Sequence, residues 1–273
     1  MKFPFRNKYL LAPMEEVNDV AFRLLCKKAG AGLTYTGMIN PLTQQKIHLD
    51  DKPALQLFCT NTKGIKEFVK KYDKKVCLWD FNLGCPAKTA RKHGFGVFLH
   101  HDMKTIEKIL KTIRESTKKL VTIKIRKSRY ALKITKLAEK YCDAICIHPR
   151  TQKQGYSGES DLKFAEKIKK QAKIPVIYSG NVTEKNADLL LKKFDYVMIG
   201  RKAIGNPEIF AKLTNKKIMF DFKDYLKLAG KYDFPFRQIK FQAMNFTKRK
   251  RGARKLRLKI SRVKNLKELM SCL

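Results

Sequence analysis

Residues 120–148 read LVTIKIRKSRYALKITKLAEKYCDAICIH, and this stretch decides the fold. A short apolar run at 120–125 is followed by helical spacing at 134–141 and by a second apolar run at 143–148. Short runs rich in aliphatic and β-branched residues are typical of strands that are buried in a parallel sheet. The stretch therefore predicts a strand, a helix and a second strand.

The same unit recurs along most of the chain. Strands are expected at 9–12, 33–36, 54–58, 76–82, 120–125, 143–148, 174–178 and 195–199, with helical spacing at 20–29, 65–72, 106–113, 134–141, 162–168 and 187–194. This alternation predicts an α/β fold in which eight units close into a (β/α)8 TIM barrel. An open doubly wound sheet would usually carry a glycine-rich turn after its first strand, whereas this strand ends in Ala12-Pro13-Met14.

The alternation stops near Leu213, and helical spacing resumes from about Asp221. We expect a TIM-barrel domain over residues 1–215 and a small helical domain over residues 216–273. Residues 237–264 hold twelve Lys or Arg and no Asp or Glu, interleaved with regularly spaced apolar residues. The pattern predicts helices with one apolar side docked and one basic side free. A disordered basic tail is the alternative.

Charge and cysteine usage narrow the class of protein. The net charge of +37 attracts polyanions, and nucleic acid is the leading candidate partner. Lysines that serve only solubility are the alternative. The seven cysteines form no C-x-x-C pair, which argues against a zinc site and fits a reducing cytoplasm. Without a signal peptide or an apolar run of membrane length, the sequence predicts a soluble cytoplasmic protein that needs no metal or membrane.

Polar side chains end four successive predicted strands. Alternate residues of a barrel strand face the interior, and active sites lie at the carboxyl ends of the strands. On the inward faces lie Gln56, Asn82, Lys124 with Arg126, and His148. Burying such groups is costly unless a ligand or another polar group satisfies them. A ligand pocket at this rim is therefore expected.

The seventh and eighth predicted strands end in glycine-containing turns. In this fold a phosphate commonly lies at that place, held by backbone N–H groups that glycine lets approach closely. Either glycine alone could belong to an ordinary turn. Together the turns predict a phosphate site formed by Ser179, Gly180, Asn181, Gly200 and Arg201.

These residues resemble the tRNA-dihydrouridine synthases, from about Leu11 to Arg257. D-F-N-L-G-C-P-A-K at 80–88 is similar to the family's N-x-G-C-P-x-x-K loop, which places the catalytic cysteine at Cys85. L-A-P-M-E-E-V-N-D at 11–19 is similar to the first signature of the family, with Glu16 and Asn18 in place of glycine and threonine, and Gly37 stands where glutamate is usual. Further matches are I-K-I-R at 123–126, I-H-P-R-T-Q-K-Q-G-Y-S-G at 147–158, S-G-N-V at 179–182, M-I-G-R-K-A-I-G-N-P at 198–207 and R-G-A-R-K-L-R at 251–257.

The resemblance implies an enzyme that reduces the 5,6 double bond of a uridine in tRNA. FMN would be the cofactor, NADPH or NADH a transient reductant, and Cys85 the proton donor. It further implies that the flavin is contacted by Pro13, Met14, Gln56, Lys124 and His148, in addition to the phosphate site above. The substrate would be contacted by Asn82, Arg126, Arg150, Arg237, Lys240, Arg251 and Arg254. We expect a monomer.

Two rival interpretations remain open at the level of the sequence. A small-molecule FMN barrel dehydrogenase of the dihydroorotate or dihydropyrimidine type would use the same barrel, and the basic carboxyl-terminal segment argues against it. A non-catalytic RNA-binding protein on a barrel scaffold is the other. Cys85 and the polar strand ends argue against that second interpretation.

Overall fold

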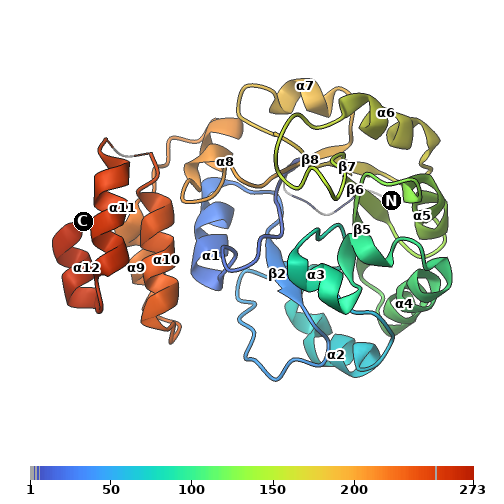
Figure 1. Cartoon of the computed structure of the whole chain (residues 1–273), viewed down its shortest axis with the longest axis horizontal. Helices are drawn as coiled ribbons and strands as arrows, with labels where there is room; N and C mark the ends of the chain where they lie inside the picture. The colour runs from blue at the N-terminus through green and yellow to red at the C-terminus, as the bar shows by residue number, and fades with distance from the viewer. Residues whose placement is uncertain (1–2, 4, 6, 250) are drawn as a thin grey trace.

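The computed structural model describes residues 3, 5, 7–249 and 251–273, and it confirms the α/β barrel (Figure 1). Eight parallel strands form one sheet in the order β1-β8-β7-β6-β5-β4-β3-β2, with helices on its outside. The strands are β1 (Tyr9–Leu11), β2 (Tyr35–Ile39), β3 (Ala54–Leu57), β4 (Leu78–Leu83), β5 (Leu120–Arg126), β6 (Ala144–His148), β7 (Val176–Tyr178) and β8 (Tyr196–Ile199). All eight predicted strands are present.

The sheet closes between β1 and the residues that precede β2. Leu10 and Leu33 form a parallel bridge, and the Leu11 N–H donates to the Leu33 carbonyl over 2.9 Å. The strand predicted at 33–36 is displaced, because β2 begins at Tyr35 and its register against β3 shifts between Tyr35 and Met38. Such a shift is a β-bulge, which inserts residues that a period-two pattern does not reveal.

The barrel helices follow the predicted alternation. They are α1 (Val20–Ala29), α2 (Ile65–Tyr72), α4 (Met103–Ser116), α5 (Ala131–Ala138), α6 (Leu162–Gln171), α7 (Ala187–Leu191) and α8 (Glu208–Leu213). Three of them begin after an aspartate whose carboxylate accepts a backbone N–H of the first turn, as Asp19, Asp102 and Asp161 do. Unpredicted short elements are α3 (Lys88–His93), η1 (Asp73–Lys75) and η2 (Gly96–Leu99).

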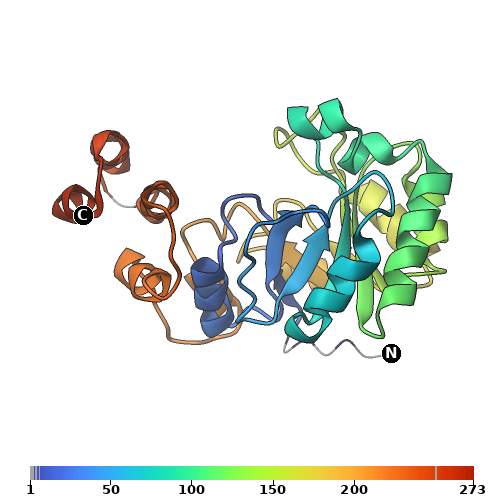
Figure 2. The same cartoon turned by 90° about the horizontal axis from the view of Figure 1, so that it is seen from below.

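Four further helices follow the barrel and confirm the predicted helical segment. They are α9 (Phe222–Ala229), α10 (Phe236–Phe246), α11 (Ala253–Arg262) and α12 (Leu266–Cys272), and they stand beside α1 and α8 (Figures 1 and 2). The ring centroids of Phe22 in α1 and Phe246 in α10 are 6.4 Å apart, edge to face. Both rings belong to one continuous buried cluster, so these helices pack on the barrel.

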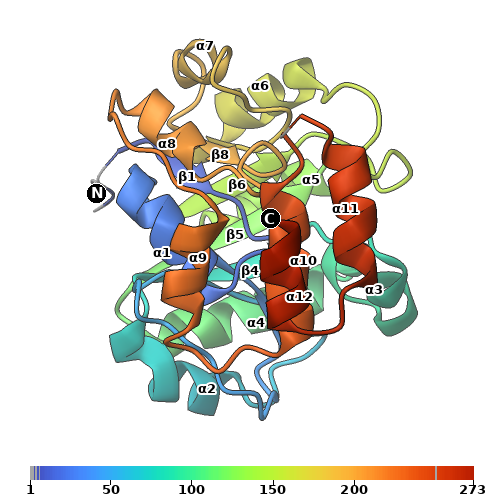
Figure 3. The same ribbon diagram turned by 90° about the vertical axis from the view of Figure 1, so that its left-hand side faces the viewer.

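A buried carboxylate joins the two parts of the chain. Besides capping α1, the Asp19 side chain accepts hydrogen bonds at Oδ2 from the amide nitrogens of Gln238 (2.7 Å) and Gln242 (2.6 Å) in α10 and from the Tyr225 hydroxyl (3.2 Å) in α9. Figure 3 shows α9 and α10 alongside α1. Asp19 therefore links α1 of the barrel to α9 and α10, the first two carboxyl-terminal helices.

Candidate active site

A cavity of about 1060 Å³ opens at the carboxyl ends of the strands, where barrel active sites lie. Fourteen of the predicted site residues line it: Pro13, Met14, Gln56, Asn82, Cys85, Lys124, Arg126, His148, Arg150, Ser179, Gly180, Asn181, Gly200 and Arg201. Within the described part of the chain, no group of three or more His, Cys, Asp or Glu could hold a metal ion. Likewise, no helix among these residues is long and apolar enough to cross a membrane.

The loop after β4 carries Cys85. The Cys85 N–H donates to Asn82 Oδ1 over 3.0 Å, and the Cys85 carbonyl accepts from the Val97 N–H over 3.2 Å. Gly96, at φ +66°, packs against this residue, since a Cβ there would lie 2.7 Å from the Cys85 oxygen. Burial raises the pKa of the Cys85 thiol, so the sulfur is protonated at neutral pH. Such a thiol can donate a proton.

A buried histidine, His100, forms a hydrogen bond with the last residue of β4, directly before the same loop. His100 Nε2 donates to the Leu83 carbonyl over 2.5 Å, while Nδ1 lies 2.7 Å from the Ser128 hydroxyl. Burial lowers the pKa of His100 to about 4, so the ring is neutral. The sequence analysis did not single out His100 or Gly96, because neither lies at the end of a strand.

Lys124 brings a positive charge to the cavity floor. Among the described residues its Nζ has no hydrogen-bond or ion-pair partner, and burial lowers its pKa. Its strand neighbours, Asn82 on β4 and Cys146 on β6, are uncharged. The Asp80 carboxylate acts on this ammonium without forming an ion pair, so the cavity keeps a positive charge that suits an anionic ligand.

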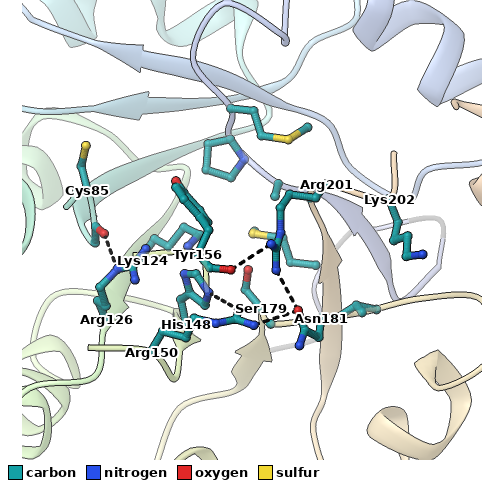
Figure 4. A pocket seen from close by; sticks show the side chains of 18 of the residues that line it. Cys85, Lys124, Arg126, His148, Arg150, Tyr156, Ser179, Asn181, Arg201 and Lys202 are labelled. Carbon is teal, nitrogen blue, oxygen red and sulfur yellow. Dashed lines mark hydrogen bonds between the residues drawn. The ribbon is translucent and has the colours of Figure 1, made fainter. Parts of the chain in front are cut away.

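A cationic cluster lies at the far side of the cavity from Cys85 (Figure 4). Arg150 and Arg201 each donate to Asn181 Oδ1 over 2.8 Å, and Asn181 adopts a left-handed conformation at φ 48°. Gly180 precedes it at a close approach, because a Cβ there would lie 3.0 Å from Ser160 Cβ. Two guanidiniums converging on one strand-end turn have the charge and geometry that suit a phosphate. Arg150, predicted to contact substrate, lies in this cluster, and its position favours a cofactor contact.

His148 is neutral in this surrounding. Burial and the cations nearby lower its pKa, and Arg150 Nη1 lies 3.1 Å from His148 Nε2. A guanidinium can only donate, so Nε2 accepts and the ring proton resides on Nδ1. The imidazole is thus left with one N–H donor.

The chain matches one known protein family over most of its length. The family model described as "Dihydrouridine synthase (Dus)" matches residues 10–270. The chain belongs to the dihydrouridine synthase family. It is 30% identical over 233 residues to tRNA-dihydrouridine synthase B of Pasteurella multocida (strain Pm70), covering 76% of this chain and 69% of that protein. It is 33% identical over 230 residues to the protein of the same name from Xanthomonas axonopodis pv. citri (strain 306), with the same coverage.

Solved structures support the fold of this synthase. Morphinone reductase in complex with tetrahydroNAD matches with a TM-score of 0.59 at 11% identity, over 82% of this chain and 92% of that chain. A structure titled TcOYE with pHBA also gives 0.59, at 10% identity, over 85% and 96%. At such identities the likeness concerns the barrel alone. Together with the family model, these findings show that the synthase is an oxidoreductase built on a TIM barrel.

Arg126 of the synthase clamps two loops together at the cavity. Its Nε donates to the Gly84 carbonyl over 3.0 Å and its Nη1 to the Gly155 carbonyl over 2.7 Å. Tyr156, which is 59% exposed, lies with its ring 5.5 Å from the guanidinium of Arg126 and 5.8 Å from that of Arg201. Sequence reasoning did not single out Tyr156. The Tyr156 ring thus makes cation–π contacts with two arginines that line the cavity.

The four basic residues predicted to bind substrate in the carboxyl-terminal helices lie outside this cavity. Arg237 Nη2 lies 3.3 Å from the Glu16 carboxylate, and Arg251 and Arg254 are exposed. Lys240 instead donates to the Ser261 and Val263 carbonyls, at the end of α11. These bonds favour a structural role for Lys240, because a cation near a helix carboxyl end stabilises that helix.

Proposed function

We propose that this dihydrouridine synthase reduces the C5–C6 double bond of a uridine in tRNA. The observation that carries the proposal is a protonated, half-buried Cys85 thiol facing a cationic cluster across one barrel cavity. The net charge of +37 and the names of the curated relatives support tRNA as the substrate. A monomer in the cytoplasm remains our prediction.

FMN is the cofactor that the cavity residues fit. The unpartnered ammonium of Lys124 suits the negative charge of a reduced flavin ring, and His148 has one N–H to offer it. Asn181, Arg201 and Arg150 suit the ribityl phosphate, assisted by the predicted contacts Ser179, Gly180 and Gly200, while Pro13 and Met14 line the ring side. When bound, FMN supplies the hydride that no side chain can, and NADPH or NADH would renew it.

Cys85 would supply the proton. The S–H bond would break as the C5–H bond forms with the electron pair of the uracil double bond, the hydride that the cofactor supplies would bond to C6, and the thiolate would recover its proton from solvent. Asn82 Oδ1 is occupied by backbone N–H groups, so its amide can only donate toward the base, for which a uracil carbonyl is the matching acceptor. Arg126, fixed by backbone carbonyls, borders the same space.

Recognition of tRNA would use the basic carboxyl-terminal helices. A uridine within folded tRNA must be turned out of its stack, which costs a few kcal/mol, and phosphate contacts offset that cost. Arg251 and Arg254 are exposed and suited to such contacts. A small-molecule dehydrogenase on the same barrel is the second candidate, and it gives no reason for this basic segment.

Cys85→Ala tests the mechanism. The variant should keep its flavin absorption near ~450 nm and its reduction by NADPH, because neither involves the thiol. Reoxidation of the reduced flavin by tRNA should slow by about 10² or more, the usual contribution of a positioned general acid. Cys77→Ala, a half-buried thiol outside the cavity, is the matched control. Anaerobic rapid mixing separates the two half-reactions, and reoxidation at the wild-type rate would show that Cys85 is not the acid.

A further inference from the structure

A chain of buried side-chain hydrogen bonds runs beneath the cavity to the Cys85 loop. Asp80 Oδ2 accepts from Gln56 Nε2 over 2.6 Å, and Gln56 Oε1 accepts from Asn82 Nδ2 over 2.7 Å. Asn82 Oδ1 then accepts the backbone N–H groups of Gly84 (3.1 Å) and Cys85 (3.0 Å). We call this chain, Asp80 to Gln56 to Asn82, the amide relay.

Strand register explains why the relay can form. Gln56 on β3 is the register partner of Asp80 on β4, which in turn is the partner of Thr122 on β5. The Thr122 hydroxyl donates to Asp80 Oδ1 over 2.5 Å, so both carboxylate oxygens are satisfied. Asp80 and Gln56 are each only 1% exposed, so bulk solvent does not compete for their hydrogen bonds.

The two ends of the relay fix its direction. Backbone N–H groups can only donate, so Asn82 must turn its oxygen toward Gly84 and Cys85. An ionised carboxylate can only accept, so Gln56 must turn its nitrogen toward Asp80. Burial raises the pKa of Asp80 to about 6, which leaves it ionised at pH 7. Each donor in the relay therefore meets one acceptor.

We propose that Asp80 is a positioning residue that sets, through Gln56 and Asn82, the placement of the Cys85 loop. Asp80 does not line the cavity, whereas Gln56 and Asn82 do. Its effect passes through two amides whose orientation it dictates, so that the Asn82 oxygen holds the backbone of the residue that delivers the proton. The consequence for catalysis rests on the proposed function, whereas the relay itself does not.

Exchanging the carboxylate at position 80 and the amide at position 82 tests this proposal. In Asn82→Asp two carboxylates face Gln56, which can donate to only one, so its oxygen opposes the other. In Asp80→Asn the amide at position 80 can donate or accept, so the direction is no longer imposed. In the double variant D80N/N82D the new carboxylate accepts from Gly84, Cys85 and Gln56. The new amide then donates to Gln56 Oε1 and accepts from Thr122, and every donor is matched again.

Hydrogen exchange of the peptide spanning residues 83–88 is the measurement, followed by mass spectrometry on the flavin-loaded enzyme. We expect exchange at Gly84 and Cys85 to accelerate about tenfold in N82D, the cost of one mismatched buried hydrogen bond, and less in D80N. The double variant should return to within about twofold of the wild type. Asp143→Asn, just before β6, alters a part-buried acceptor of the Val121 N–H and should leave this peptide unchanged.

Rescue separates positioning from simple support of the fold. A carboxylate that only stabilises the barrel would give two independent losses, so a double variant that exchanges faster than either single variant overturns the proposal. Unchanged exchange in N82D overturns it as well. If a single variant does not fold, a folded double variant supports the relay and an unfolded one contradicts it. Because exchange does not depend on uridine reduction, the relay and the proposed function can fail separately.

Discussion

One carboxylate accepts three of the hydrogen bonds that connect the barrel to the carboxyl-terminal helices, and Asp19→Asn tests its contribution. Asparagine is a good amino-terminal cap, so Oδ1 can continue to accept the Phe22 N–H. The new amide nitrogen, however, replaces Oδ2 and faces the donors of Gln238, Gln242 and Tyr225. The substitution therefore keeps the cap of α1 and removes the acceptor of three hydrogen bonds between the two parts, while their apolar packing remains.

The two glutamines cannot turn over to accommodate this change. Gln238 Nε2 also donates to the Glu16 carbonyl over 2.9 Å, and Gln242 Nε2 donates to the Val17 carbonyl over 2.8 Å. A flipped amide would direct its oxygen at a carbonyl oxygen. Each hydrogen bond to a charged group contributes about 1.5–3 kcal/mol, and neighbouring losses are not additive, so we expect a decrease of about 2–4 kcal/mol in the free energy of unfolding.

Urea unfolding at pH 7 measures the effect. Asp102→Asn is the matched control, since Asp102 caps α4 through the Thr105 N–H on the barrel surface. It should lose much less, because asparagine also caps a helix and only a solvent-screened interaction of the charge with the helix dipole is removed. A loss in Asp19→Asn no greater than in Asp102→Asn would refute the assignment of Asp19 as the link between the two parts.

Two other expectations follow from the same structure. His100, whose pKa burial lowers to about 4, stabilises the fold fully above the usual value of 6.5 and loses that contribution as the pH falls toward 4. The free energy of unfolding, measured in urea titrations, should therefore decrease by up to about 3 kcal/mol over this pH range, and this decrease should be absent in His100→Gln. If the free energy of unfolding depends on pH equally in the wild type and in His100→Gln, the expectation is wrong. Arg251→Gln with Arg254→Gln should reduce the slope of log affinity for tRNA against log salt by about 2, whereas Lys66→Gln with Lys70→Gln on α2 should leave it unchanged. If the two double variants have the same salt dependence of tRNA affinity, the carboxyl-terminal helices make no special contact with tRNA phosphates.

Much of the barrel could be predicted because each strand combines an aliphatic run with a polar end. Ile123 and Ile125, which alternate with Lys124 along β5, are fully buried, while Lys124 between them lines the cavity. Side-chain alternation along a strand is a local property, so it can be derived from the sequence alone. The family motifs then located Cys85 at the end of β4.

Contacts between strands could not be predicted in the same way. The sequence analysis placed Gln56 and Asn82 at the rim, but their mutual hydrogen bond and their link to Asp80 depend on the register of β3 against β4. Periodicity within a strand does not fix that register. For the same reason the sequence does not reveal that Lys240, predicted to contact the substrate, donates to carbonyls at the end of α11. The packing of α10 against α11 determines which basic side chains of α10 remain available to bind a ligand.

The distribution of charge bears on how this enzyme selects a uridine. Residues 216–273 hold 18 Lys and Arg against 4 Asp and Glu, and residues 1–215 hold 43 against 20, so the barrel carries +23 of the net charge of +37. A field that extends over both parts attracts tRNA without orienting it, since phosphate contacts carry no sequence information. Orientation must come from shape, which the fixed placement of α9 and α10 on α1 defines. The choice of uridine should therefore depend more on the Asp19 contact than on any single surface lysine.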